Sequence, residues 1–257
     1  MIENLTVAEI STSFVFLEWD EPLEMSLGIS FKVQWTADKT SGNEVTTDTS
    51  CNITGLTAGV NYTFCITAVA ADTSTESESV CISAWTKPDV ITNLTAGDIT
   101  TSSVLLNWTK PNGQSSHYHV EYGDKNVTTE NTSIKINDLT PGAQYTFEVF
   151  AVAADNVTEG RSSQIPLYTK PDVISNFTVN SITTSSVFLT WNEPMGNRDF
   201  FKLNWTDKKT SNHTTINNTW YNITGLTAGV NYTFCITTVA EDDSDGDTLC
   251  ISQYTSM

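Results

Sequence analysis

Basic residues are scarce in this sequence. Twelve Lys and Arg stand against 30 Asp and Glu, which gives a formal net charge of −18. Nucleic-acid binding requires clustered Lys and Arg to meet the phosphates, and docking on an anionic membrane surface requires them as well. The charge balance therefore excludes both nucleic acid and a membrane surface as partners of this chain.

Long apolar runs and helical periodicity are missing as well. No stretch approaches the ~20 apolar residues of a membrane helix, and no segment repeats its apolar residues every 3.6 positions. Met1 is followed by Ile2, Glu3 and Asn4, without the basic and apolar parts of a signal peptide. Hydrophobic residues still make up 39% of the chain. We expect an ordered fragment, or a chain whose signal peptide has been removed.

An internal repeat of about 85 residues organises the chain. Residues 53–67 return almost unchanged at 223–237, and residues 136–147 are a looser copy. Thr-Lys-Pro-Asp closes the first two copies at 86–89 and 169–172. The proline at each junction interrupts strand pairing. We therefore expect three modules, a first module at 1–87, a middle module at 88–170 and a third module at 171–257.

Apolar residues alternate with polar ones inside each module, as strands require. Val15, Leu17 and Trp19 alternate with Phe16 and Glu18, and comparable runs end at Gly, Asn or Asp. The pattern predicts roughly seven short strands per module, which fits a two-sheet β-sandwich. The fold class is therefore all-β. Because the junctions leave almost no free linker, we expect a semi-rigid rod on the order of 100 Å long.

A Trp on the second strand, then Leu-x-Pro-Gly-x-x-Tyr before a strand with Tyr-x-Phe, resembles the fibronectin type III module. The middle copy carries the whole motif, as Leu139, Pro141, Gly142 and Tyr145. The outer copies keep Leu56, Gly59, Tyr62, Leu226, Gly229 and Tyr232. They depart from it at Ala58 and Ala228, where proline is expected. The resemblance implies seven-stranded immunoglobulin-like sandwiches in which Tyr62, Tyr145 and Tyr232 hydrogen-bond to nearby backbone as tyrosine corners.

The dense, Asn-rich repeats are also similar to the ectodomains of receptor-type protein tyrosine phosphatases. The catalytic signature of that family, a His-Cys followed by an Arg-ended phosphate loop, is absent, because no Cys here follows a His. The resemblance implies an extracellular, ligand-binding segment of a single-pass cell-surface receptor that binds an unidentified protein. The phosphatase domain and the membrane anchor would lie outside this chain. The alternative is a module array of a matrix or cell-adhesion protein, such as a tenascin, acting as a structural spacer.

Asn-x-Ser/Thr sequons are unusually frequent. They use 14 of the 21 asparagines, whereas a Ser and Thr content of about a quarter would produce only about five by chance. The excess indicates a glycan coat on a secreted or cell-surface protein, although Thr-rich strands copied three times would also generate sequons. The sequon asparagines are Asn4, Asn52, Asn61, Asn93, Asn107, Asn126, Asn131, Asn156, Asn176, Asn204, Asn212, Asn217, Asn222 and Asn231.

Strand alternation places on the outer face those sequon asparagines that stand next to a core residue, namely Asn107, Asn204, Asn61, Asn231, Asn52 and Asn222. Such a coat would leave bare the junctions between modules and the turn tips, where the acidic residues Glu76, Glu78, Asp243 and Asp245 gather. A partner reached there would be basic, and its association would slow with added salt. The alternative is that these acids only keep the chain soluble.

Two cysteine positions are occupied together or are empty together in the three modules. Cys65 and Cys81 correspond to Cys235 and Cys250, and the middle module lacks both. This predicts two disulfides, Cys65–Cys81 and Cys235–Cys250, each joining the sixth and seventh strands. Two pairs of reduced surface thiols are the alternative. Cys51 aligns with Ile134 and Tyr221 on the inward side of the fifth strand. We expect it to be a buried, reduced thiol, with an intermolecular disulfide as the alternative.

Chemistry-bearing clusters are few. His117 and His119 lie two apart on one strand face, and a zinc site needs three or four ligands, so we expect solvated histidines. Residues 241–247 resemble the front half of a calcium loop, but Ser252 replaces the closing Glu. We expect an acidic hairpin turn there, built on Asp-Gly. Phosphate-loop, dinucleotide and nucleophile-elbow motifs are absent. We therefore predict no cofactor, no metal and no enzymatic activity within this chain.

Overall fold

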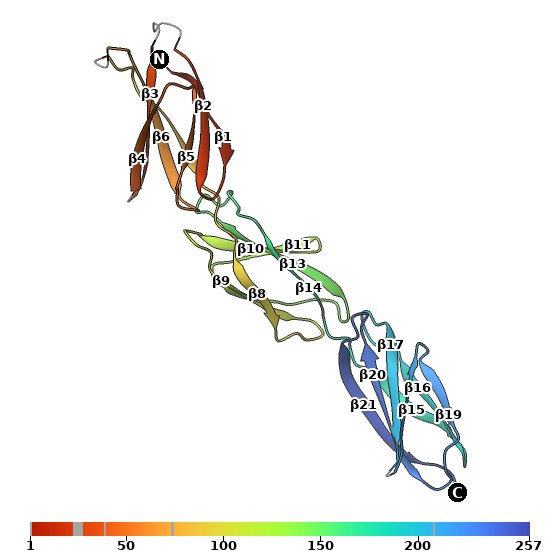
Figure 1. Cartoon of the computed structure of the whole chain (residues 1–257). Coiled ribbons are helices and arrows are strands. Elements are labelled where there is room, and N and C mark those ends of the chain that lie inside the picture. The colour runs from red at the N-terminus through yellow and green to blue at the C-terminus, as the bar shows by residue number, and fades with distance from the viewer. Residues whose placement is uncertain (1, 23–27, 39, 73–74, 208) are drawn as a thin grey trace. The chain divides into compact units, whose positions relative to one another are not determined.

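A computed structural model of the chain describes residues 2–22, 28–38, 40–72, 75–207 and 209–257. In this described part, the chain forms 21 strands and no helix, with seven strands in each expected module (Figure 1). The all-β prediction is confirmed, and so is the number of strands per module. Both predictions rest on the alternation of apolar and polar residues, because successive side chains of a strand point to opposite faces.

The first module pairs its strands into two antiparallel sheets. A three-stranded sheet has the order β1-β2-β5, and a four-stranded sheet has the order β4-β3-β6-β7. The strands are β1 (Glu3–Ile10), β2 (Phe14–Asp20), β3 (Ser30–Ala37), β4 (Thr40–Thr46), β5 (Ser50–Thr54), β6 (Asn61–Val69) and β7 (Val80–Trp85).

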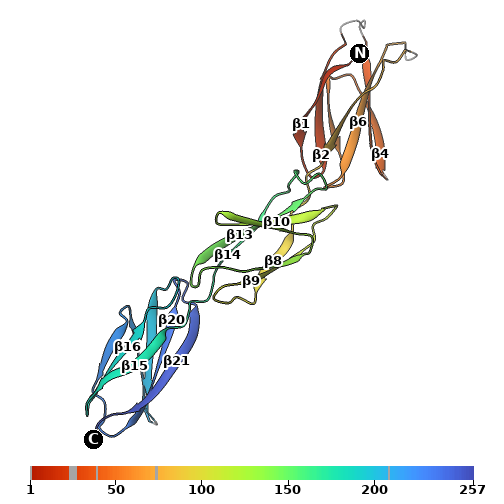
Figure 2. The same ribbon diagram turned by 180° about the vertical axis from the view of Figure 1, so that it is seen from behind.

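The third module repeats this arrangement. Its sheets have the orders β15-β16-β19 and β18-β17-β20-β21, and Figure 2 shows β15 beside β16 from behind. The strands are β15 (Ser175–Ile182), β16 (Ser186–Asn192), β17 (Phe200–Thr206), β18 (Ser211–Ile216), β19 (Trp220–Thr224), β20 (Asn231–Val239) and β21 (Asp245–Tyr254).

The middle module has sheets of the orders β12-β9-β8 and β11-β10-β13-β14. The chain divides into two compact units, and the division runs through this module, with β10 and β11 in the first unit and β12 in the second. The strands are β8 (Thr92–Gly97), β9 (Val104–Thr109), β10 (His117–Tyr122), β11 (Lys125–Thr129), β12 (Ser133–Ile136), β13 (Gln144–Val152) and β14 (Ser163–Tyr168).

Each outer module has one hydrophobic core between its two sheets. In the first module, Leu17 and Ile53 of the three-stranded sheet pack with Phe31 and Phe64 of the four-stranded sheet, and all four are fully buried. The repeated Trp of the second strand meets an aromatic ring of the third strand edge to face in every module. The ring centroids are 5.4 Å apart for Trp19 and Phe31, 5.2 Å for Trp108 and Tyr118, and 5.5 Å for Trp191 and Phe201. Such pairs stabilise a core beyond the area that they bury.

A tyrosine corner is present in all three modules, as the resemblance implies. The hydroxyl oxygens of Tyr62, Tyr145 and Tyr232 accept hydrogen bonds from the backbone N–H groups of residues five positions earlier. These bonds are Thr57 N to Tyr62 Oη at 3.0 Å, Thr140 N to Tyr145 Oη at 3.0 Å, and Thr227 N to Tyr232 Oη at 3.2 Å. The tyrosine ring thus fixes the connection before the sixth strand to that strand.

A buried threonine at the end of each module reinforces this connection, and the sequence reading did not single it out. The Thr86 hydroxyl donates to the Thr57 carbonyl at 2.7 Å and accepts from Val60 N at 3.0 Å. Thr169 and Thr255 make the equivalent bonds. Because these hydroxyl groups are buried, both bonds are needed to offset the loss of water. The repeated Thr-Lys-Pro is the signal that could have revealed two of them.

Candidate functional site

The two cysteine pairs lie on the outer faces of the four-stranded sheets of the first and third modules. Cys65 stands directly opposite Cys81 in the β6–β7 register, and Cys235 stands opposite Cys250 between β20 and β21. The structure joins both pairs as disulfides, each with a Cα–Cα distance of 4.1 Å. These are the pairings expected from the joint absence of both cysteines in the middle module.

Cys51 is a free, buried thiol on β5, opposite Leu17 of β2. Its Sγ lies 3.7 Å from the Oε2 atom of Glu44, to which the thiol donates. Burial, together with the nearby Glu44 carboxylate, raises the pKa of the Cys51 thiol to about 11. The thiol therefore stays protonated at neutral pH and is a poor nucleophile and a poor metal ligand.

The 14 sequon asparagines lie at the surface. All are exposed except Asn107, which is partly buried, whereas the adjacent core residues Tyr62, Ile53, Tyr232 and Ile223 are at most 4% exposed. A glycan on these asparagines would project away from the cores. The exposure is what glycosylation requires of an acceptor, and occupancy of the sequons stays a prediction.

At four of the sequon positions, the backbone conformation itself also favours asparagine. Asn4, Asn93, Asn156 and Asn176 have φ between 51° and 61°, a left-handed conformation that Asn tolerates better than most residues. Asn4 and Asn176 lie where the first strand of their module shifts register, and the Asn4 amide donates to Asp20 Oδ2 at 2.6 Å. At these four positions, the asparagine is explained without a glycan. The other ten sequons have no such explanation.

A basic side chain on the third strand faces an acid at or next to the turn between the sixth and seventh strands in every module. Lys32 pairs with Glu76 in the first module, and Lys202 Nζ lies 2.6 Å from Asp245 Oδ1 in the third. In the middle module, the cation is replaced by His119, whose Nδ1 lies 2.9 Å from Glu159 Oε1. Sequence reasoning missed this repeated pair, because the two residues are more than 35 positions apart and only strand pairing brings them together.

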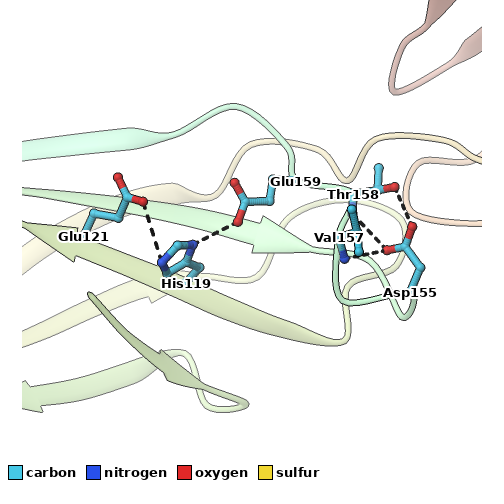
Figure 3. A network of polar contacts seen from close by, with 6 residues as sticks. All are labelled: His119, Glu121, Asp155, Val157, Thr158 and Glu159. Atoms are coloured by element: carbon cyan, nitrogen blue, oxygen red, sulfur yellow. Dashed lines mark hydrogen bonds and ion pairs between the residues drawn. The ribbon is translucent and has the colours of Figure 1, made fainter. Parts of the chain in front are cut away.

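His119 is therefore partnered and not solvated, which corrects the expectation for this residue. Its side chain is 20% exposed, and its Nε2 lies 3.7 Å from Glu121 Oε1 on the same strand, so that it stands between two glutamates (Figure 3). Among the described residues, no three His, Cys, Asp or Glu side chains form a metal-binding group.

The turn beside His119 is fixed by its own hydrogen bonds. Asp155 Oδ1 accepts from the backbone N–H groups of Val157 and Thr158, and its Oδ2 accepts from the Thr158 hydroxyl at 2.6 Å (Figure 3). Partial burial by itself would raise the pKa of Asp155, but these hydrogen bonds outweigh it and lower the pKa. The turn that carries Glu159 is thus held in place by a carboxylate that stays ionised.

The acidic segment 241–247 departs from its expected form. The turn is built on Asp242, whose Oδ1 accepts from Ser244 N and Oγ, and on Asp243, with φ of 64°. Asp245 and Gly246 already belong to β21, so the expected Asp-Gly turn is wrong. The Asp245 carboxylate also pairs with Lys202, as Glu76 does with Lys32. Two of the four acids expected to await a basic partner are therefore already paired within the chain.

The sequence model of the fibronectin type III domain matches residues 1–83, 89–167 and 171–246. This chain belongs to the fibronectin type III domain family. The match covers most of the chain in three separate segments, and it agrees with the seven-stranded sandwiches and the tyrosine corners described above. Among the described residues of these fibronectin type III modules, no helix is long and apolar enough to cross a membrane.

Curated proteins with similar sequences fall into two groups. The chain is 34% identical over 257 residues to Receptor-type tyrosine-protein phosphatase eta of Gallus gallus, which covers 96% of this chain. It is 33% identical over 205 residues to Receptor-type tyrosine-protein phosphatase H of Homo sapiens, covering 76% of this chain. Tenascin-R of Rattus norvegicus is 22% identical over 250 residues, covering 93% of this chain.

The chain spans only 18% of the length of each of these three proteins. The resemblance to receptor-type phosphatases inferred from the sequence is confirmed, with tenascins as the second group. The part of this chain that matches them consists of fibronectin type III modules.

Proposed function

We propose that this chain is part of the extracellular region of a receptor-type protein tyrosine phosphatase, where its modules bind an extracellular protein. The observation that carries the proposal is 34% identity to the phosphatase eta of Gallus gallus across 96% of the chain, against 22% for Tenascin-R. The divisions at 87/88 and 170/171 are part of the proposal. The catalytic domain and the membrane anchor would lie in other parts of the whole protein.

The surface of the modules supports an extracellular location. Disulfides persist in oxidising compartments, and two of them are present on the outer faces of the four-stranded sheets. The sequon asparagines are exposed, or partly so for Asn107. In the proposed setting, most of these asparagines carry glycans, and the acidic charge and the glycans together keep the modules apart.

The four-stranded sheets of the first and third modules differ at the residue of the third strand that stands opposite the cysteine of the sixth strand. In the third module, Asn204 of β17 stands opposite Cys235 of β20, so a glycan on Asn204 would cover the outer face of the sheet beside the disulfide. In the first module, the equivalent residue is Gln34, opposite Cys65. The β4 strand has no sequon, whereas β11 of the middle module carries Asn126 on the outer face, opposite Glu121. The outer face of the four-stranded sheet of the first module therefore carries no sequon except Asn61 at the start of β6.

We place the binding surface for a protein ligand on this outer face of β4, β3, β6 and β7. Its central residues, Gln34, Thr63 and Ser83, are neutral and polar, and Val45 at the edge is 62% exposed. The nearest Lys, Lys32, is already paired with Glu76. A mixture of neutral hydrogen-bonding groups and one apolar side chain is typical of protein–protein interfaces. This surface replaces the acidic turn tips as the expected binding region.

The sequence offers a direct test, because Gln34 is followed by Trp35 and Thr36. The substitution Gln34→Asn therefore creates the same Asn-Trp-Thr sequon that the third module has at Asn204. The glycosylated chain, secreted from animal cells, would be screened against a library of extracellular proteins. For the ligand found, Gln34→Asn should weaken binding at least tenfold, because a glycan would occupy the face. The matched variant Asn204→Gln should leave binding unchanged.

Two outcomes would go against the proposal. Equal binding by the glycosylated Gln34→Asn variant and the unchanged chain would rule out this face. Absence of any ligand in the screen would favour the second candidate function, a structural spacer in a matrix protein, which the similarity to Tenascin-R over 93% of the chain supports. A third check is the full coding sequence, which should continue into a membrane segment and a phosphatase domain.

A further inference from the structure

The third module exposes an aromatic pair on its three-stranded sheet. Trp220, the first residue of β19, is 49% exposed, and its ring centroid lies 5.8 Å from that of Phe188 on the neighbouring strand β16. The two rings are inclined by 31°. Contact of large aromatic side chains with water costs free energy, so a group that covers this pair would stabilise the module.

The sequon residue Asn222 lies next to both rings. It stands directly opposite Phe188 in the β16–β19 register, and it shares the outer face with Trp220, two residues before it on the same strand. Opposite residues have Cβ atoms about 5 Å apart, and residues i and i+2 are about 7 Å apart. A sugar attached to Asn222 Nδ2 would therefore lie over these two rings.

The other modules vary these positions together. In the first module, the sequon residue Asn52 stands opposite Phe16, and Ser50 takes the place of Trp220. In the middle module, the sequon is absent, and Lys135 stands opposite Leu105. A phenylalanine thus faces this position wherever the sequon is present, and an aliphatic residue faces it where the sequon is missing.

We infer that Phe188 and Trp220 form a stacking platform for the first sugar of an N-linked glycan on Asn222. The inference rests on the glycan coat of the proposed function. In the modification, Asn222 Nδ2 bonds to C1 of the first sugar, the bond from C1 to the pyrophosphate of a lipid-linked oligosaccharide breaks, and the amide proton is released. The C–H groups on one face of the sugar then meet the electron-rich faces of the rings.

A shallow pocket of about 370 Å³ lies beside Trp220, and a second sequon residue in its lining is the competing site of glycan attachment. The pocket is lined by Thr215, Ile216, Asn217, Asn218, Trp220 and Tyr221, and Asn217 is itself a sequon residue. Asn222 is the better acceptor for the platform, because it is the residue directly opposite Phe188. Asn217 precedes β19 and has no pairing with β16.

The test uses the full chain secreted from animal cells and trimmed enzymatically to one N-acetylglucosamine per site. Glycopeptide mass spectrometry first measures occupancy of Asn222. Proton–carbon NMR spectra then compare the unchanged chain with Asn222→Gln, Asn217→Gln and the double variant Phe188→Leu/Trp220→Ser. That double variant installs the residues that the middle module has opposite Lys135 and the first module has at Ser50.

We expect one set of sugar signals shifted upfield by the ring currents, lost in Asn222→Gln, kept in Asn217→Gln, and moved to ordinary positions in the double variant. Removal of the glycan should lower the thermal midpoint of the third module by about 4 °C in the unchanged chain and not in the double variant. An occupied Asn222 with unshifted signals would overturn the platform and leave the glycan coat intact. Shifted signals lost in Asn217→Gln would overturn the choice of Asn222, and an empty Asn222 would overturn the platform together with the coat at this site.

Discussion

The middle module and the two outer modules share their framework and differ on their surfaces. All three have the edge-to-face Trp pair, the tyrosine corner and the buried threonine. Only the outer modules have a disulfide, a phenylalanine opposite a sequon, and a lysine paired with the acid of the last turn.

The difference distinguishes the framework residues that the fold requires in every module from the surface features that only the outer modules have. The middle module has Glu148 and Gln164 at the cysteine positions, and Glu148 stands opposite Glu121 across β10 and β13. Like charges that face each other destabilise a sheet. The middle module thus has a pair of like charges near the place where each neighbour gains stability from a disulfide.

The largest expected difference is the response to reduction. Each disulfide closes a loop with a sequence separation of 15 or 16 residues, which stabilises a domain by about 3 kcal/mol in the chain-entropy view. Dithiothreitol should lower the free energy of unfolding of the first and third modules by about that amount. Hydrogen-exchange mass spectrometry reads the modules separately. Loss of protection in the middle module would contradict the comparison, and Glu148→Cys/Gln164→Cys should make that module sensitive to reduction as well.

The tyrosine corner should give the same effect in every module. Replacing Tyr62, Tyr145 or Tyr232 by Phe removes one hydrogen bond to a backbone N–H and should cost about 1 kcal/mol of unfolding free energy in the module concerned. The measurement is again module-resolved hydrogen exchange, with Tyr254→Phe as a control, because Tyr254 is 63% exposed. A cost confined to the outer modules would mean that the framework is not shared.

The cation on the third strand should have a smaller effect. An imidazole gives the Glu159 carboxylate one hydrogen bond, whereas lysine would bring a compact, full positive charge. The substitution His119→Lys should therefore stabilise the middle module by about 0.5 kcal/mol at pH 7.5, since partly exposed ion pairs contribute little. Denaturant unfolding at low and high salt measures it. If the gain survives in the background Glu159→Gln, the ion pair is not its source.

Ionisation of the Cys51 thiol should leave the free energy of unfolding of the first module unchanged at neutral pH and should lower it only in alkaline solution. The folded thiol has a pKa of about 11, against 9.0 for an ordinary cysteine. Between pH 9 and 11 the unfolded chain releases this proton while the folded chain keeps it, so the stability of the first module falls as the pH rises. Cys51→Ile, which installs the residue of the middle module, should remove this part of the pH dependence. Rapid alkylation of native Cys51 at pH 7 would contradict its burial.

Much of the framework was predictable because it depends on periodicity. Alternation set the strands, and the joint absence of two cysteines in the middle module revealed which of them are partners. The left-handed asparagines, such as Asn4, were not predictable, because periodicity does not tell which residue of a register shift takes a positive φ. The Lys32–Glu76 pair and the Phe188–Asn222 neighbours depend on strand register, which residue order alone does not supply. The turn at Asp243 was misplaced because the stronger Asp-Gly signal lies two residues later.

The central claim is that these are extracellular modules whose outer members are held by disulfides and covered by glycans. It is tested most directly by mapping the peptides of the chain secreted from animal cells, without reduction. The account predicts Cys65 linked to Cys81, Cys235 linked to Cys250, a free thiol at Cys51, and glycans on Asn204 and Asn222. A Cys51–Cys65 link, or sequons that are empty throughout the third module, would contradict it.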